Sequence, residues 1–82
     1  MELIVRTPLQ LANSIRTRRR KLGLSQEKLA ITIGVRQKTL SDIENAKSAR
    51  LDTLLRIFAA LDLELVVRAR TKSSANDIEA IF

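Results

Sequence analysis

Residues 24–45 read LSQEKLAITIGVRQKTLSDIEN, and this stretch decides the fold. Ser25 can cap a short helix, which would end at Gly34 because glycine adopts a left-handed backbone without steric cost. A second helix would then begin at residue 36 or 37 and end near Asn45. Apolar residues recur at helical spacing in both segments: Leu29, Ala30, Ile33, Leu40 and Ile43. The pattern predicts two amphipathic helices joined by a tight turn, in a helix-turn-helix arrangement.

The composition limits the chain to one small domain. Its 82 residues are 45% hydrophobic but include only two aromatic residues, Phe58 and Phe82, so the core must be aliphatic, as suits a compact helical bundle. Cysteine and histidine are absent, which removes disulfides, the usual zinc ligands and the commonest general base. We therefore expect no catalytic residue, no metal and no cofactor. Since no apolar run approaches the roughly 18 residues that a membrane span needs, we expect a cytoplasmic protein.

The net charge of +6 is unevenly distributed. Between Arg6 and Arg50, eleven lysines and arginines face three acids, and the remainder is slightly acidic. Such a basic segment attracts polyanions, of which nucleic acid is the commonest inside a cell. A run of charge taken alone fits a solvated face equally well.

Two further helices are expected around the central pair. Thr7 followed by Pro8 is a strong helix start, and this helix should run to about Lys21, before Gly23 ends it. It would place Leu11, Ile15 and Leu22 near one face. A fourth helix should span about residues 51–61. The residues that we expect it to bury are Leu51, Leu54, Leu55, Ile57, Phe58 and Leu61.

The segment of residues 63–70 has a different periodicity. In an extended chain, Leu63, Leu65 and Val67 would lie on one side and the residues between them on the other. This period of two, in a segment rich in β-branched residues, predicts a strand. A single strand leaves its backbone groups unpaired, so it must pair with residues 3–6 of the same chain or with its copy in a second chain. A two-fold dimer is the economical solution.

A domain of residues 1–70 is thus expected to be followed by a flexible tail, residues 71–82. The tail begins with small polar residues and ends with apolar ones, among them Ile78, Ile81 and Phe82. This apolar end is either a partner-binding peptide or a weakly packed chain end without such a role.

A set of short motifs extends over about residues 9–61. They are Ile15-Arg16, Gly23-Leu24-Ser25-Gln26, Leu29-Ala30, Gly34-Val35, Leu40-Ser41, Glu44-Asn45, Thr53-Leu54-Leu55-Arg56-Ile57 and Ala60-Leu61. Together they resemble the Cro/phage-repressor (Xre) helix-turn-helix family. The segments PLQLAN at residues 8–13 and LDLEL at residues 61–65 look like the HipB-type antitoxins within it. The resemblance implies a lambda-repressor-like all-α bundle of four to five helices, to which the short C-terminal β-strand would be added.

The resemblance also implies roles for single residues. Gln26 would bond a phosphate and brace Gln37. The side-chain amide of Gln37 can bond adenine through both its carbonyl oxygen and its amino group. The expected base-reading residues are Arg36, Gln37, Lys38 and Ser41, of which Arg36 either reads a base or clamps a phosphate. The expected phosphate contacts are Gln26, Thr39, Asn45, Lys47 and Arg50, which fix the register on DNA but carry little sequence information.

Three features near the predicted interface have other or open roles. Asp42 departs from the residues often found at its position and either accepts from cytosine or repels a phosphate. Glu44 should point inward, with Arg19 as a possible partner. The basic run of residues 16–21 is a DNA flank, a toxin-binding face or a solvated surface.

The leading hypothesis is a dimeric repressor that places two recognition helices in successive major grooves of a palindromic operator, about 34 Å apart. The HipB-like resemblance adds the neutralisation of a HipA-type serine/threonine kinase toxin, with autoregulation of the operon and association with the nucleoid through the operator. The alternative is a solitary Xre-type regulator without a toxin. Membrane binding is disfavoured because the first helix carries no aromatic residue on its apolar face, and an enzyme because no catalytic constellation is recognisable.

Overall fold

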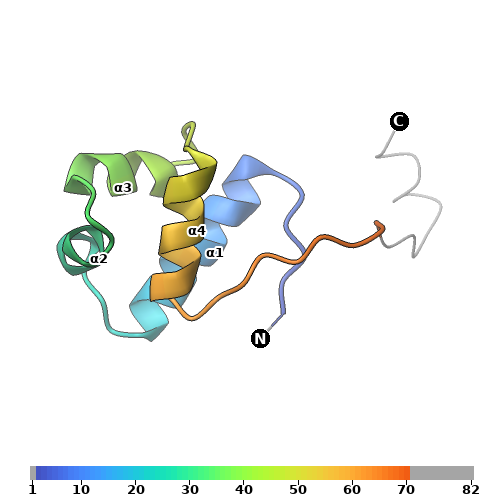
Figure 1. Cartoon of the computed structure of the whole chain (residues 1–82), viewed down its shortest axis with the longest axis horizontal. Helices are drawn as coiled ribbons and strands as arrows, with labels where there is room; N and C mark the ends of the chain where they lie inside the picture. Colours follow the sequence, from blue (N-terminus) through green and yellow to red (C-terminus); the bar gives the residue numbers. More distant parts are fainter. Residues whose placement is uncertain (1, 71–82) are drawn as a thin grey trace.

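The computed structural model describes residues 2–70, which form a bundle of four α-helices (Figure 1). The helices are α1 (Pro8–Lys21), α2 (Gln26–Ile33), α3 (Gln37–Glu44) and α4 (Leu51–Ala60). The predicted all-α helix-turn-helix bundle is therefore confirmed, with four helices in the described part. The predicted tail of residues 71–82, with Ile78, Ile81 and Phe82, lies outside the described residues.

The helix starts and stops follow the predicted capping residues. The Thr7 hydroxyl accepts from the amide of Gln10 at 3.1 Å, and Ser25 accepts from the amide of Lys28 at 3.0 Å. Each cap satisfies a donor that the first helical turn leaves unpaired. The turn between α2 and α3 depends on Gly34, whose φ of 75° lies in the left-handed region that favours glycine.

The end of α3 is followed by a left-handed residue. Asn45, which could itself take such a backbone, has a φ of −103°, and the following Ala46 takes φ 63° instead. Asn45 stays near the helix because its Nδ2 donates to the carbonyl of Ser41 at 2.8 Å. The chain reverses one residue later, and the amide of Lys47 then bonds the carbonyl of Asp42 at 3.0 Å.

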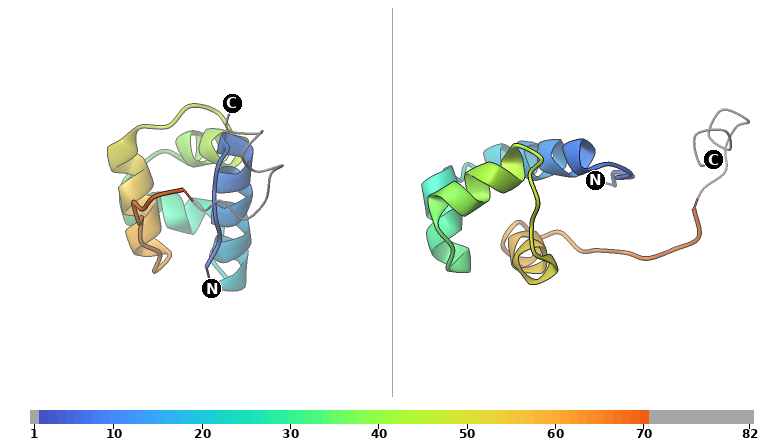
Figure 2. Two further views of the ribbon diagram at one scale, coloured as in Figure 1. Left: turned by 90° about the vertical axis from the view of Figure 1, so that its right-hand side faces the viewer. Right: turned by 90° about the horizontal axis from the view of Figure 1, so that it is seen from above.

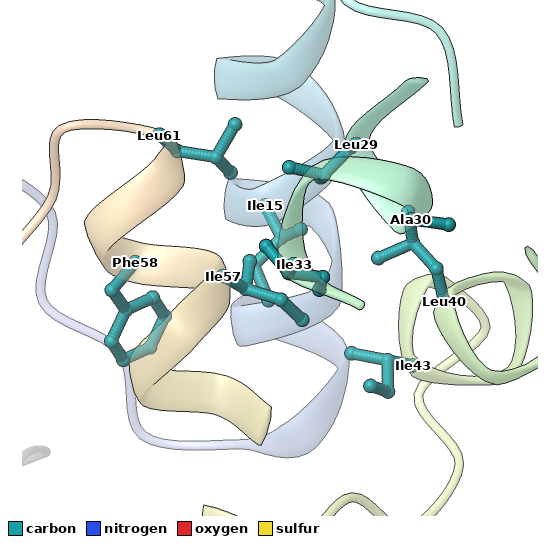
Figure 3. Close-up of a cluster of buried hydrophobic side chains, with 9 residues drawn as sticks. All are labelled: Ile15, Leu29, Ala30, Ile33, Leu40, Ile43, Ile57, Phe58 and Leu61. Atoms are coloured by element: carbon teal, nitrogen blue, oxygen red, sulfur yellow. The ribbon is translucent and has the colours of Figure 1, made fainter. Parts of the chain in front are cut away.

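The core is aliphatic apart from Phe58 and takes residues from all four helices and the residue that follows α4 (Figure 3). Helix α2 packs against both α3 and α4, and α1 packs against α3. The core residues are Ile15 from α1, Leu29, Ala30 and Ile33 from α2, Leu40 and Ile43 from α3, and Ile57, Phe58 and Leu61 from α4 and its end. The inner faces of α2 and α3 are thereby fixed, which leaves the opposite face of α3 to solvent.

Three leucines that we expected to be buried are exposed. Leu51 and Leu55 are 64% and 45% exposed, because α4 turns the neighbouring residues Thr53, Leu54, Ile57 and Phe58 toward the bundle. Leu22 is 43% exposed because it lies beyond the last turn of α1. These positions leave apolar side chains on the surface of the single chain.

The predicted strand is not formed within residues 2–70. Residues 63–70 run as extended chain away from the helices (Figure 2), and no ladder joins them to residues 3–6, so of the two pairings that the sequence left open, the structure does not support the one within the chain. Leu63 is half-buried beside the core, but Leu65 and Val67 are 56% and 92% exposed. The alternation of apolar residues determines which side of a strand would face an apolar layer. A strand forms only where its backbone amides and carbonyls also pair with a neighbouring strand, and the alternation does not supply that partner.

Candidate nucleic-acid interface

The outer face of α3 carries the residues predicted to read bases. Gln37 and Lys38 are exposed in its first turn, Ser41 is half-buried one turn later, and Arg36 is the exposed residue just before the helix. No side chain caps the amino end of α3, so its first amides also face outward. The structure therefore brings all four predicted base-reading residues onto one end and one side of α3.

The inner face of α3 anchors the helix. Leu40 and Ile43 are buried in the core, and Val35 in the turn packs against that core while its amide bonds the carbonyl of Ala30 at 3.0 Å. Arg56 of α4 donates from Nη1 to the carbonyl of Ile33 at 3.1 Å, at the end of α2. The helix-turn-helix unit is thus held from two sides, and the contact from Arg56 has no recognisable signal in the sequence.

A buried ion pair joins α1 to the end of α3. Arg19 donates from Nε to Glu44 Oε2 at 2.8 Å and from Nη2 to Glu44 Oε1 at 2.9 Å, and both side chains are nearly inaccessible. The third contact of Arg19 is from Nη1 to the carbonyl of Leu24 at 2.8 Å. The hydrogen bond to Glu44 raises the pKa of Arg19, although burial acts in the opposite direction. The expected partnership of Glu44 and Arg19 is confirmed.

The basic run of residues 16–21 is largely committed to the fold. Arg16 donates to the carbonyl of Glu44 and lies 3.7 Å from its carboxylate, and Arg18 donates from Nε to the carbonyl of Leu61 at 2.9 Å. Together with Arg19, these side chains join α1 to the ends of α3 and α4. Of the cations in this run, only Arg20 and Lys21 are exposed, so the run is a weaker DNA flank than its charge implies.

Gln26 lies at the start of α2 but does not brace Gln37 in this structure. Its Nε2 donates to Glu44 Oε1 at 3.4 Å, so its half-buried side chain points toward the buried ion pair. The position remains beside the amino end of α2, where amides are available to an anion.

Most of the predicted phosphate-contact residues lie on α3 or follow its carboxyl end. Thr39 is exposed on α3, and Asn45, Lys47 and Arg50 are exposed in the loop of residues 45–50. The Nε of Arg50 lies 3.2 Å from the Oδ1 of Asp52. Loss of solvation would raise the pKa of Asp52, but Arg50, the Thr53 amide and Arg56 together lower it. The loop is thus a cationic edge next to the outer face of α3.

Asp42 lies between two lysines of the predicted interface, Lys38 and Lys47. Its Oδ2 is 3.4 Å from Lys38 Nζ, one turn earlier on α3, and its Oδ1 is 3.6 Å from Lys47 Nζ. Both lysines were predicted to contact DNA, one at a base and one at a phosphate. Their pairing with a single carboxylate was not foreseen from the sequence.

Other kinds of site find no support among residues 2–70. That part of the chain groups no three carboxylates that could hold a metal ion. Its longest helix, α1, has 14 residues, and none of the four helices is long and apolar enough to cross a bilayer.

Known proteins resemble this chain in sequence and in structure. A helix-turn-helix family model matches residues 15–67. The Escherichia coli K12 antitoxin HipB is 32% identical over 74 residues, which cover 89% of this chain and 84% of HipB. HipB in an O4 20mer complex superposes with a TM-score of 0.79 at 31% identity, and HipB in a HipA-HipB-O2-O3 complex with 0.78 at 31% identity. Each comparison covers 85% of this chain and 100% of the other. The chain thus belongs to the Xre-type helix-turn-helix family and is similar to the HipB antitoxins within it.

Proposed function

We propose that this protein is a sequence-specific DNA-binding repressor that places α3 in the major groove. The observation that carries the proposal is the outer face of α3, where Gln37 and Lys38 are exposed on a helix whose other face is buried. Amide and ammonium groups on such a helix can bond base edges in the major groove, and the cationic edge at residues 45–50 can hold the flanking phosphates. The similarity to HipB, which forms a complex with the O4 20mer, supports this assignment.

Replacing Gln37 by alanine tests base reading. We expect the substitution to weaken binding to a preferred duplex by about 1–3 kcal/mol and to relax the preference at one base position. Lys47→Ala is the matched change at a phosphate-contact position, and it should weaken binding without relaxing the preference at any single base position. Selection from a random duplex library, followed by fluorescence anisotropy on selected and scrambled duplexes, measures both effects. Equal losses on the two duplexes for Gln37→Ala would rule out base reading by this residue.

We further propose that the protein acts as a dimer in which residues 63–70 of two copies pair. The support is the extended course of this segment, its exposed Leu65 and Val67, and its lack of a strand partner within residues 2–70. Unpaired strand edges and exposed apolar side chains favour pairing with another chain.

Val67→Asp tests this dimer. Val67 is 92% exposed in the single chain, so the substitution should leave folding unchanged but raise the dimer dissociation constant at least about tenfold, because a buried valine contributes about 1.5–3 kcal/mol. Val66→Asp, on the opposite side of the segment, is the control and should have a smaller effect. Sedimentation equilibrium gives both constants, and an unchanged dimer with Val67→Asp would contradict the pairing.

The second proposed role is that of an antitoxin, which binds and neutralises a HipA-type kinase and regulates its own operon together with it. The similarity to HipB, which is found in a complex with HipA, supports this role over that of a solitary regulator. The partner segment we propose is the apolar chain end with Ile78, Ile81 and Phe82.

Deletion of residues 76–82 tests the antitoxin role. We expect the shortened chain to lose co-purification with a HipA-type kinase encoded beside its gene, while DNA binding persists because the helix-turn-helix is intact. Full capture of the kinase by the shortened chain would remove the tail from the interface. The absence of a neighbouring kinase gene would favour the solitary regulator.

A further inference from the structure

Asp42 connects two cations of the proposed DNA interface. Each of its oxygens faces one ammonium group, Lys38 Nζ at 3.4 Å and Lys47 Nζ at 3.6 Å. The Asp42 side chain is only 33% exposed, whereas those of the two lysines are 82% and 65% exposed. The bond from the Lys47 amide to the Asp42 carbonyl, at 3.0 Å, holds the loop close enough for this pairing.

The two ion pairs must compete with DNA. Exposed ion pairs are weak and exchange readily, so phosphates of a duplex can take the lysines from the carboxylate. The exchange leaves the Asp42 carboxylate on α3 facing a polyanion, and like charges at an interface are unfavourable. Asp42 therefore lowers the affinity for DNA of every sequence.

The affinity for DNA that is lost to Asp42 is smaller on preferred sequences than on other sequences. On a preferred site, base contacts from Gln37 and Lys38 are gained together with the phosphate contacts, and they compensate for the displaced carboxylate. On other sequences only the phosphate contacts remain, and the lysines gain little by leaving Asp42. An element that penalises the wrong partner more than the right one increases specificity.

We infer that Asp42 is a specificity-determining residue, which holds Lys38 and Lys47 in competition with DNA phosphates and so suppresses binding to non-preferred sequences. The inference rests on the proposed DNA binding. It also resolves the two roles open for Asp42 in favour of repulsion, because both of its oxygens already face cations of the same surface.

The test compares Asp42→Asn with the unaltered chain on two duplexes of about 20 base pairs, enough for two half-sites one helical turn apart. One duplex is selected from a random library by the unaltered chain, and the other is its scrambled counterpart. We expect Asp42→Asn to bind the scrambled duplex about tenfold more tightly and the selected duplex less than about threefold more tightly. The salt dependence on the scrambled duplex should steepen by about 3–4 for the dimer, as two more cations of each copy meet phosphates.

Two controls separate this effect from a change in net charge. Asp62→Asn removes the same charge from a 98% exposed side chain that follows the end of α4, and this end of α4 lies away from α3 (Figure 1), so the substitution should leave both affinities nearly unchanged. In a chain that carries Lys38→Gln and Lys47→Gln, adding Asp42→Asn should tighten binding to the scrambled duplex much less than it does in the unaltered chain, because no cation is left to release and only the repulsion by the carboxylate is removed.

The outcomes distinguish the inference from the function on which it rests. If Asp62→Asn tightens binding as much as Asp42→Asn, the effect is general charge and the inference falls. If Asp42→Asn weakens the selected duplex, the carboxylate reads a base and the inference falls while DNA binding stands. If the selection yields no preferred duplex for the unaltered chain, the proposed sequence-specific DNA binding is itself contradicted.

Discussion

Glu44→Ala should lower the free energy of unfolding by about 3–5 kcal/mol, because it leaves the buried guanidinium of Arg19 without its carboxylate. Both side chains are nearly inaccessible, and the bonds between them, at 2.8 and 2.9 Å, are charge-assisted. The same substitution removes the carboxylate near Arg16 and the acceptor of Gln26. For a domain whose total stability is about 5–15 kcal/mol, this loss is a large fraction. Urea unfolding followed by circular dichroism measures it.

Two further variants identify the cause of the loss. Glu27→Ala removes an exposed carboxylate from α2 and should change stability by less than about 0.5 kcal/mol. The double variant Arg19→Met, Glu44→Leu removes both charges and should recover most of the stability, because an apolar pair of similar volume avoids the desolvation of ions. A double variant as unstable as Glu44→Ala alone would show that the loss comes from altered packing of these two side chains and not from the unpaired charge of Arg19.

DNA binding by the dimer should fall about a thousandfold when the salt concentration rises from about 50 to 200 mM. We attribute this to about six phosphates neutralised by two copies of the cations around α3, with a slope of about −5 in a logarithmic plot. The cations are Arg36, Lys47 and Arg50, with Lys38 directed to a base. Anisotropy titrations at four salt concentrations on the selected duplex give the slope.

The origin of this slope is tested by variants on two surfaces. Arg50→Gln should reduce it by about 1.8 in the dimer, since each copy loses one phosphate contact. Lys21→Gln changes an exposed cation at the end of α1 and should have no such effect, because we place the DNA at α3 and the loop of residues 45–50. A larger reduction by Lys21→Gln would place the DNA on the basic run of α1 instead.

Much of the fold could be predicted because local signals agree with one another. Thr7 with Pro8, Ser25 and Gly34 each determine a helix end through their own backbone or side-chain chemistry, and the structure uses all of them. The apolar residues expected to face the core from α2 and α3, namely Leu29, Ala30, Ile33, Leu40 and Ile43, repeat at helical spacing and are buried. The outward placement of Gln37 and Lys38 follows from the same periodicity.

What could not be predicted depends on contacts between distant segments. Leu51 and Leu55 are as apolar as the residues that α4 buries, so only the packing direction of the helix decides that they are exposed. The ion pairs of Asp42 require the chain reversal at Ala46, a residue with no intrinsic preference for a left-handed backbone. Residues 63–70 take the extended course that their alternation predicted, but the predicted strand is not formed within residues 2–70, because its formation depends on a neighbouring backbone that the local sequence does not determine.

The division of α3 into two faces has a consequence for the evolution of this protein. Leu40, Ile43 and Glu44 hold the helix in place, while the positions that face outward contribute little to stability. If Gln37 and Lys38 read bases as we propose, substitutions at these positions alter the preferred duplex without endangering the fold. A duplicated gene can diverge at these positions alone, so that the two copies in one cell come to regulate separate promoters.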